Sequence, residues 1–368
     1  MKIAFIGYRG MVGSVLVNRM IEEGDFDKHE VQLFSTSQAG SKINTEYTLI
    51  SETLGDAFDL ELLTQFDCVL TCQGSDYTSK VYPRLKQNGW KGYWVDAASL
   101  LRMDDDSVIC LDPINLDTIK NAHKNGVKTF VGGNCTVSLM LMGVGALFKH
   151  DLVEWVSSMT YQAASGAGAK NMIELLNQMK FLGTHAENLI AENKNILEID
   201  KKISEGLAHP HLPADNFGFP LAGNILPWID TLVEFGQSRE EWKGMAETNK
   251  ILETKNPVPI DGTCVRVGAM RSHAQALTIK LKKNVGIDEI SQMIQEDHAW
   301  SSVIANTKES TLSGLTPAAV SGTLDIPVGR LRKMKLGDEY LNAFTVGDQL
   351  LWGAAEPLRR MVNLLSEL

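Results

Sequence analysis

The first third of the chain alternates short runs of β-branched and apolar residues with stretches of helical periodicity. Residues 2–7 (KIAFIG) precede residues 11–24 (MVGSVLVNRMIEEG), and residues 67–72 (DCVLTC) precede residues 75–89 (SDYTSKVYPRLKQNG). Strands that are separated by helices pair in parallel, because the helix carries the chain back to the same edge of the sheet. We therefore predict a parallel α/β sheet with crossover helices.

The pattern changes from Val153 onward. Residues 153–164, 263–271 and 274–281 form longer runs in which polar and apolar residues alternate, with helices between them. This pattern predicts a second, mixed α+β domain, which a chain of 368 residues with 44% hydrophobic composition can support. We expect residues 209–228, rich in Pro, Gly and Asn, to form a long ordered loop. The apolar spacing of residues 347–365 predicts a helix that packs back onto the first domain.

Charge and composition exclude several classes of partner. The formal net charge of -10 argues against nucleic acid and anionic membranes, because both require a positive face. The apolar run before Tyr8 is too short for a signal peptide, and no run reaches membrane-spanning length, so we expect a cytoplasmic protein. The five cysteines match no zinc spacing, so we expect reduced thiols and no metal site.

A glycine-rich segment follows the first predicted strand. Gly7, Gly10 and Gly13 stand at the start of a predicted helix, where small residues let backbone N–H groups approach phosphates. The spacing differs from the common dinucleotide fingerprint, and the alternative is a tight turn without a ligand. The next strand ends in residues 34–42 (FSTSQAGSK), which offer no carboxylate for a ribose, so the residues favour NADP over NAD. A polar surface loop is the alternative there.

Cys135 lies between Gly132-Gly133-Asn134 and a long apolar run. Asn134 is a suitable N-cap, and the amide groups at the start of a helix can lower the pKa of a thiol, which makes Cys135 a candidate nucleophile. The alternative is a small buried apolar residue, which is the role of most free cysteines.

Arg266 and His273 flank a glycine-containing bend between two predicted strands. Such a bend can bring both side chains to one cleft, where His273 could take the thiol proton and Arg266 could hold a carboxylate by two hydrogen bonds. A structural histidine and a surface arginine are the alternatives.

Five segments occur together in order: residues 7–14 (GYRGMVGS), 132–142 (GGNCTVSLMLM), 161–172 (YQAASGAGAKNM), 240–252 (EEWKGMAETNKIL) and 266–276 (RVGAMRSHAQA). With them, the chain resembles the aspartate-semialdehyde dehydrogenase family of the bacterial type. The resemblance implies the fold of glyceraldehyde-3-phosphate dehydrogenase. Residues 1–133 would form a Rossmann NADP-binding domain, completed by the C-terminal helix 349–368, and residues 134–348 a catalytic and dimerisation domain that makes the protein a homodimer.

The resemblance also implies roles for single residues. Cys135 would be the nucleophile, His273 the acid and base, and Gln162 a residue that positions the reacting group. The substrate-binding residues would be Arg266 for the α-carboxylate, Glu240 for the α-ammonium, and Lys243, Arg102 and Asn134 for phosphate. The cofactor-binding residues would be Gly7, Arg9, Gly10, Met11, Val12, Gly13, Ser37, Gln38, Gln73, Ser165, Gly166 and Gln349. Taken without the resemblance, Glu240 and Lys243 share a helix face and can equally form an ordinary ion pair.

The implied activity is the reversible, NADPH-dependent conversion of L-aspartyl-4-phosphate to L-aspartate 4-semialdehyde and inorganic phosphate through a thioester on Cys135, in lysine, threonine, methionine and diaminopimelate biosynthesis. N-acetyl-glutamyl-phosphate reductase and glyceraldehyde-3-phosphate dehydrogenase are rivals with similar chemistry. A hydrolase that uses Cys135 and His273, and a non-catalytic NADP-sensing module, are rivals from other classes.

Overall fold

The computed structural model describes residues 1–368. The first domain is built on a seven-stranded sheet in which every neighbouring pair is parallel, in the order β3-β2-β1-β4-β5-β7-β6. Its strands are β1 (Lys2–Ile6), β2 (Glu30–Ser35), β3 (Gly55–Asp56), β4 (Cys68–Thr71), β5 (Tyr93–Asp96), β6 (Ser107–Cys110) and β7 (Thr129–Gly132). The parallel sheet that the alternation of the sequence predicts is therefore confirmed.

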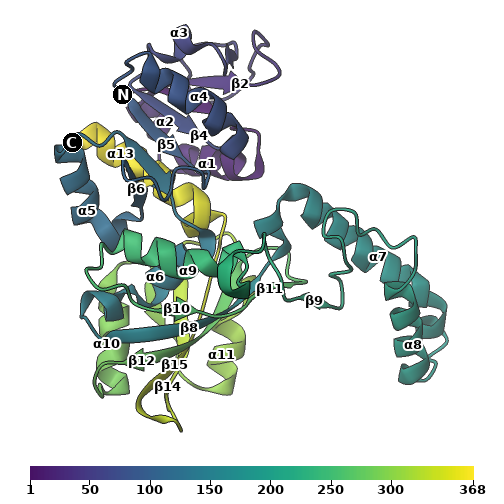
Figure 1. The fold of residues 1–368 in the computed structure, drawn as a ribbon. Coiled ribbons are helices and arrows are strands. Elements are labelled where there is room, and N and C mark those ends of the chain that lie inside the picture. The colour runs from purple at the N-terminus through teal and green to yellow at the C-terminus, as the bar shows by residue number, and fades with distance from the viewer.

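Helices cover both faces of this sheet, because its apolar side chains alternate between them. Ala4 and Ile6 face the core that contains residues of α4, whereas Ile3 and Phe5 face the core that contains residues of α1 and α13. The helices of this part of the molecule are α1 (Met11–Glu22), α2 (Asp25–Lys28), α3 (Leu60–Leu63), α4 (Ser75–Gln87), α5 (Asp112–Lys124) and α13 (Glu356–Glu367). Figure 1 shows α13, from the far end of the chain, lying beside β5 and β6.

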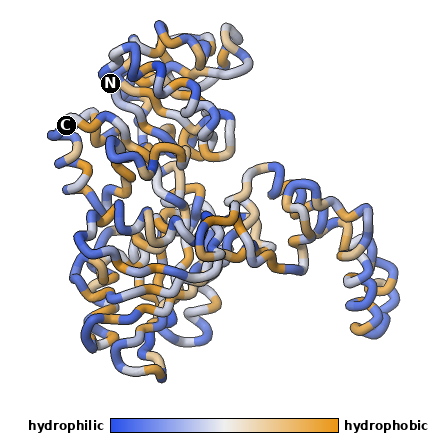
Figure 2. The backbone as a smooth tube through the Cα atoms, in the orientation of Figure 1, coloured by the Kyte–Doolittle hydropathy of each residue, from blue (hydrophilic) through white to orange (hydrophobic).

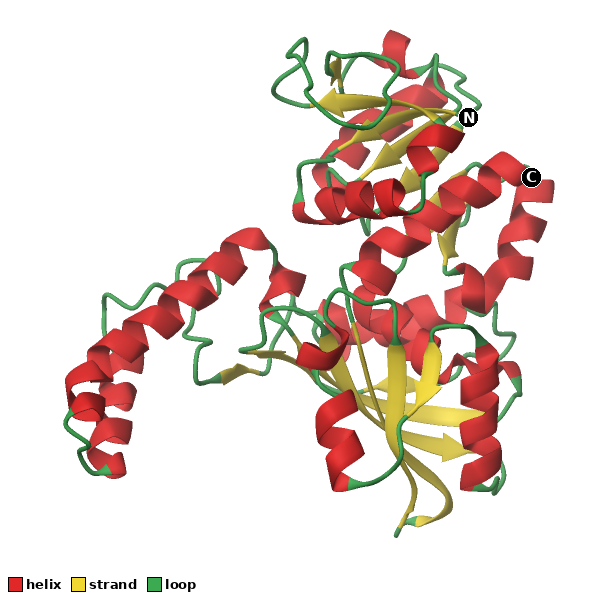
Figure 3. Ribbon diagram, turned by 180° about the vertical axis from the view of Figure 1, so that it is seen from behind, coloured by secondary structure: helices red, strands yellow, loops and turns green.

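The second domain is an eight-stranded mixed sheet, in the order β13-β14-β15-β12-β8-β11-β9, with β10 paired to β8. Its strands are β8 (Val153–Gln162), β9 (Ile225–Leu226), β10 (Ile260–Asp261), β11 (Cys264–Val267), β12 (His273–Leu281), β13 (Ser301–Val303), β14 (Ile326–Met334) and β15 (Gly337–Gly347). Its helices are α6 (Cys135–Lys149), α9 (Arg239–Ile251), α10 (Ile287–Asp297), α11 (Lys308–Gly314) and α12 (Pro317–Val320). Figure 3 shows the strands of the two sheets as two separate groups. The α+β pattern expected from Val153 onward is confirmed.

An arm leaves the second domain between β8 and α9 (Figure 1). It starts with a short 3-10 turn, η1 (Ala164–Ala167), and continues as α7 (Ala169–Ala191), α8 (Ile196–Leu207) and the long loop to η2 (Glu234–Gly236). Two buried polar side chains of α7 order this loop. Glu174 accepts hydrogen bonds from the amides of Asn216 and Phe217, and Gln178 accepts those of Leu221 and Ala222.

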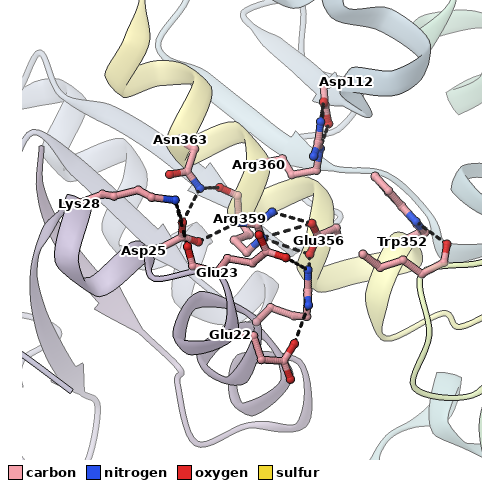
Figure 4. A network of polar contacts seen from close by, with 12 residues as sticks. Glu22, Glu23, Asp25, Lys28, Asp112, Trp352, Glu356, Arg359, Arg360 and Asn363 are labelled. Carbon is pink, nitrogen blue, oxygen red and sulfur yellow. Dashed lines mark hydrogen bonds and ion pairs between the residues drawn. The ribbon is translucent and has the colours of Figure 1, made fainter. Parts of the chain in front are cut away.

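The C-terminal segment joins the two domains. A π-helical turn, η3 (Leu351–Ala355), connects β15 to α13, and Figure 4 shows the polar network that fixes α13 to the first domain. Arg359 donates to Asp25 at 2.9 Å and to Glu356 at 2.8 Å, while Arg19 donates to Glu356 at 3.0 Å. Burial raises the pKa of Glu356, but the hydrogen bonds and charges of the two arginines outweigh it and hold the pKa below its ordinary value. The carboxylate of Glu356 is therefore charged, and it depends on these arginines.

None of the helices is both long enough and apolar enough to span a lipid bilayer.

Removal of one partner from this network should destabilise the fold. In Arg359→Met, the buried carboxylates of Asp25 and Glu356 lose a cation, so we expect a loss of about 3–5 kcal/mol in the free energy of unfolding. Denaturant titration measures the change, and Arg84→Met, at an exposed position of α4 without a side-chain partner, serves as the control. Equal stability of the two variants would contradict the role of this network.

Candidate active site

A cleft of about 560 Å³ lies where the two domains meet. Its walls come from the start of α1, the turn after β5, the start of α6, the end of β8 with η1, the loop before α9, α9 itself, β11 and η3. The lining includes Met11, Val12, Arg102, Asn134, Cys135, Gln162, Ser165, Gly166, Glu240, Lys243, Arg266 and Gln349. Residues from all three predicted groups, catalytic, substrate-binding and cofactor-binding, thus share one cleft.

Cys135 is the first residue of α6 and is half-buried at the cleft surface. Asn134 caps this helix, because its side-chain oxygen accepts hydrogen bonds from the amides of Thr136 at 2.9 Å and Val137 at 3.2 Å. On its other side, Cys135 packs against Gly353 of the π-helical turn. A Cβ atom on Gly353 would lie 2.8 Å from the Cβ of Cys135, so no side chain fits there.

The thiol of Cys135 is not ionised in the unliganded protein. Burial raises its pKa to about 12 and the charge of Glu240 adds to the rise, while Arg266, Arg102 and Lys243 act in the opposite direction. The lowered pKa that the helix terminus alone suggests is therefore not the net result, because desolvation exceeds the help from nearby positive charge.

His273 lies directly beneath the cleft wall, with its Nε2 atom close to Gly166. A Cβ atom on Gly166 would lie 2.9 Å from Nε2 of His273 and 2.8 Å from Nη1 of Arg266, so the two side chains converge on this glycine. The main chain of Ala163 orients both of them. Its N–H donates to Nδ1 of His273 at 3.1 Å, and its carbonyl accepts from Nη1 of Arg266 at 2.8 Å.

These contacts determine the state of the imidazole. Because Nδ1 of His273 accepts a hydrogen bond, the neutral ring carries its proton on Nε2, which has no partner in the protein. Burial lowers the pKa of His273 to about 3, and the charge of Arg266 adds to the decrease. The ring is therefore neutral and offers an N–H group near Gly166.

Glu240 joins Asn134, Gln162 and Lys243. Its carboxylate accepts hydrogen bonds from Asn134 Nδ2 at 3.0 and 3.1 Å, Gln162 Nε2 at 3.2 Å and Lys243 Nζ at 3.0 Å. Lys243 also donates to Asp230 at 2.8 Å. The ion pair that the spacing of Glu240 and Lys243 predicts does form, but it is buried and belongs to this larger network.

Arg102 is held by Glu247, one helical turn beyond Lys243 on α9. Glu247 accepts from Nη1 of Arg102 at 3.1 Å and from the amide of Asn134 at 2.6 Å, and Arg102 also donates to the carbonyl of Gly132 at 2.7 Å. One buried carboxylate thus fixes Arg102, a cation of the first domain, beside Asn134, the residue that precedes Cys135.

The turn between β1 and α1 has the geometry that a bound phosphate requires. Gly7 has φ +83°, and a Cβ atom there would lie 2.8 Å from the amide nitrogen of Gln73. A Cβ atom on Gly13 would lie 2.1 Å from the carbonyl oxygen of Gly7, so only glycine allows this close turn. No side chain caps the start of α1 at Gly10, which leaves its first amides free for an anion.

A cation lies at the end of β2, where NAD-binding proteins usually carry a carboxylate. Arg9 donates to Oγ of Ser35 at 3.1 Å and also contacts the side chain of Gln38. The same Ser35 oxygen accepts from the amides of Ser37 and Gln38. This corner suits a 2′-phosphate, so the residues present fit NADP.

The remaining predicted residues lie around the cleft. Gln349 accepts from the amide of Ser272 at 2.8 Å and contacts Ser165, which ties the η1 turn to the end of β15. The residues of the cofactor-binding group that do not line the main cleft are Gly7, Arg9, Gly10, Gly13, Ser37, Gln38 and Gln73, all at the carboxyl ends of β1, β2 and β4.

Three contributors are absent from the sequence prediction: Glu247, Asp230 and the main chain of Ala163. Glu247 could have been found, because positions 240, 243 and 247 recur at helical spacing and share one face. Asp230 lies in an irregular loop, and the contact of Ala163 is made by backbone atoms, so no side-chain pattern points to either.

A Rossmann-type sheet with a cleft that carries a half-buried cysteine and a cluster of cations, and with a buried neutral histidine behind the cleft wall, defines an NAD(P)-dependent oxidoreductase that acts on aldehydes. Comparison with known proteins agrees with this class. Residues 2–122 match the model described as semialdehyde dehydrogenase, NAD binding domain, and residues 144–352 match semialdehyde dehydrogenase, dimerisation domain.

Comparison with solved structures narrows the assignment from semialdehyde dehydrogenases in general to one family among them. The chain is 49% identical to aspartate semialdehyde dehydrogenase from Francisella tularensis, with a TM-score of 0.95 over 100% of both chains. Aspartate semialdehyde dehydrogenase II complexed with ASA from Vibrio cholerae shares the fold at 21% identity, with a TM-score of 0.80 over 100% of this chain and 98% of that one. The enzyme with NADP from Candida albicans shares it at 16% identity, with a TM-score of 0.68 over 99% and 98%. The chain belongs to the aspartate-semialdehyde dehydrogenase family.

The raised pKa of Cys135 has a measurable consequence. Because the thiolate is the reactive form, alkylation of Cys135 by iodoacetamide in the unliganded protein should rise about tenfold per pH unit from pH 6 to 9, without a plateau. Mass spectrometry of the Cys135 peptide gives the rate. The same peptide in denatured protein is the control and should level off near the ordinary thiol pKa of about 8.5. A plateau below pH 8 in the folded protein would contradict the assignment.

Proposed function

We propose that this protein catalyses the reversible, NADPH-dependent conversion of L-aspartyl-4-phosphate to L-aspartate 4-semialdehyde and inorganic phosphate, with Cys135 as the nucleophile. The observation that carries the proposal is the position of Cys135, in a cleft that also contains the start of α1 and the cations Arg102, Lys243 and Arg266. The full-length similarity to the Francisella tularensis enzyme supports the same reaction.

In the biosynthetic direction, the sulfur of Cys135 forms a bond with the acyl carbon and the electron pair of the carbonyl moves to its oxygen. When that pair returns, the bond to the phosphate oxygen breaks, the released phosphate takes up the proton that the Cys135 thiol loses, and a thioester remains on Cys135. The Nε2–H group of His273 is the donor for the charged oxygen, and Gln162 helps to position the reacting group. Such donors lower the barrier because they stabilise charge that develops in the transition state.

Substrate recognition follows from the charges of the cleft. Arg266 can bind the α-carboxylate with its guanidinium fork, and Arg102 and Lys243 can hold the phosphate beside Asn134. Two carboxylates line the cleft, Glu240 and Asp230, and provide negative charge for the α-ammonium.

The cofactor would be held by the turn between β1 and α1 for its diphosphate, and by Arg9, Ser37 and Gln38 for its 2′-phosphate. Gln73, Ser165, Gly166 and Gln349 complete the cofactor-binding set. When bound, NADPH supplies the hydride that converts the thioester into the aldehyde.

A phosphate-dependent assay tests the proposed function. We expect reduction of NADP on addition of L-aspartate 4-semialdehyde and inorganic phosphate, and loss of this activity by more than about 10³-fold in Cys135→Ala, because no other group can form the thioester. NADP affinity of the variant, measured by calorimetry, should stay within about twofold, because Cys135 is not among the residues proposed to hold the cofactor. Turnover by the alanine variant at the normal rate would rule out the mechanism.

We also propose that the protein is a homodimer. The model matched over residues 144–352 is a dimerisation domain. Figure 2 shows apolar residues along the arm, and α7 exposes Ile173, Leu176 and Met179 at intervals of three residues. At the end of the arm, in η2, Phe235 is 98% exposed in the single chain. Such a patch is typical of a protein interface.

The five free cysteines fit a reducing compartment, and we propose the cytoplasm.

A charge placed on this surface should dissociate the dimer. Ile173→Asp, at a position 60% exposed in the single chain, would bury a carboxylate without a partner in the interface, so we expect mainly monomer in analytical ultracentrifugation at micromolar concentration. The control is Leu336→Asp, at a position 67% exposed near the turn between β14 and β15, which should leave the dimer intact. A dimeric Ile173→Asp variant together with a monomeric Leu336→Asp variant would show that the interface lies outside the arm.

A further inference from the structure

The residue that precedes His273 has a strained backbone. Ser272 is fully buried and has φ +73°, a left-handed conformation that is uncommon for serine. The next residue, His273, is the first of β12 and pairs with Gly347 at the end of β15. The direction of the imidazole therefore depends on the contacts that hold this strained residue.

Side chains from two other segments hold Ser272 in place. Its amide donates to Oε1 of Gln349 at 2.8 Å, and its hydroxyl lies 2.7 Å from the hydroxyl of Ser321, directly after α12. Because Ser321 donates its only hydroxyl proton to the carbonyl of Pro317 at 2.7 Å, Ser272 is the donor between the two serines. Both donors of Ser272 are thus used to fix the turn before β12.

Asp348 holds the same turn through a charge. Its side chain is fully buried, and Oδ2 lies 2.7 Å from Nε of Arg271, the residue before Ser272. The same oxygen accepts from the amide of Gly322 at 2.6 Å, and Oδ1 accepts from the amide of Leu350 at 3.0 Å. One buried carboxylate therefore ties together the turn before β12, the loop after α12 and the start of the C-terminal segment.

The contacts of Asp348 lead to both reacting side chains of the enzyme. On one side, the ion pair fixes the chain two residues before His273. On the other side, the hydrogen bond to the amide just before η3 fixes that turn, in which Gly353 packs against Cys135. A displaced Asp348 would therefore release the imidazole and the thiol together.

The cations proposed to bind the substrate have other anchors. Arg102 and Lys243 are held by carboxylates of α9, and Arg266 is held by the carbonyl of Ala163. Asp348 makes none of these contacts, and it does not line the cleft. A change at Asp348 should thus disturb the reacting groups more than the binding groups.

We propose that Asp348 is a positioning residue that keeps His273 and Cys135 in the relative arrangement that the reaction requires. It acts through the turn before β12 and through η3. Its effect on turnover rests on the proposed function, whereas its effect on the exposure of Cys135 is measurable without any substrate.

The substitution Asp348→Asn keeps the size of the side chain but removes the charge that pairs with Arg271. We expect kcat to fall about 10- to 100-fold, because a displacement of about 1 Å in a reacting group costs up to about 10²-fold in rate. The KM values for the aldehyde and for phosphate should stay within about threefold, because the binding groups keep their anchors. The matched control is Asp325→Asn, at an exposed position of the loop between α12 and β14, which should keep the wild-type kcat.

A second pair of variants decides the question if Asp348→Asn does not fold. Arg271 is partly exposed and pairs with Asp348 through Nε. The ammonium of a lysine lies only one bond farther along the side chain than this atom, so Arg271→Lys can keep the ion pair, whereas Arg271→Met removes it. We expect Arg271→Met to lower kcat about tenfold and Arg271→Lys to retain most of the activity. Equal kcat values for these two variants would overturn the proposal.

The reactivity of the thiols gives a readout that a loss of stability alone would not produce. Because Asp348 holds η3 against Cys135, Asp348→Asn should expose this thiol and raise its rate of alkylation by iodoacetamide at constant pH by about threefold or more. Cys68 and Cys264, buried in β4 and β11, are internal references and should keep their wild-type rates. A parallel rise at all thiols would show general loosening and would overturn the positioning role, as would an unchanged rate at Cys135.

The two proposals fail in different ways. If the wild type does not reduce NADP with L-aspartate 4-semialdehyde and phosphate, the proposed function fails, and the thiol measurement still tests Asp348. If the wild type is active and a folded Asp348→Asn variant keeps its kcat, only the positioning role fails.

Discussion

The buried carboxylate of Glu240 is the interaction on which the site depends. A charge in a nearly dry position is tolerated only when it is paired and hydrogen-bonded, and Glu240 meets this condition with donors from α6, β8 and its own helix. The same contacts fix the residue that caps α6, the amide of Gln162 and the ammonium of Lys243. Positions that are far apart in the sequence are thereby held around one sulfur atom.

Much of the fold follows from local rules. The alternation of Ile3, Ala4, Phe5 and Ile6 between the two faces of the sheet is visible in the sequence, because side chains of a strand point alternately to opposite sides. The position of Cys135 at the start of a capped helix and that of Gly13 in a close turn were also predictable. Each of these features is determined within a few residues of chain.

The electrostatics of the site could not be predicted in this way. The helix terminus suggested an acidic thiol at Cys135, yet the net effect depends on burial and on Glu240, more than one hundred positions along the chain. The protonated nitrogen of His273 is determined by the backbone amide of Ala163, between β8 and η1, and no residue pattern encodes this contact. Asp230 reaches the cleft only because the arm loop returns there. Sequence therefore identified most of the chemical groups, whereas their ionisation states required the tertiary structure.

The close packing of Gly353 against Cys135 constrains how this architecture can change during evolution. The wide π-helical turn places the beginning of the C-terminal segment against Cys135, with no space for even one additional methyl group. A single inserted or deleted residue between the last strand and the last helix would therefore reshape the surroundings of Cys135 before it disturbed either sheet. Related chains should vary in length at the tip of the arm far more freely than at this junction.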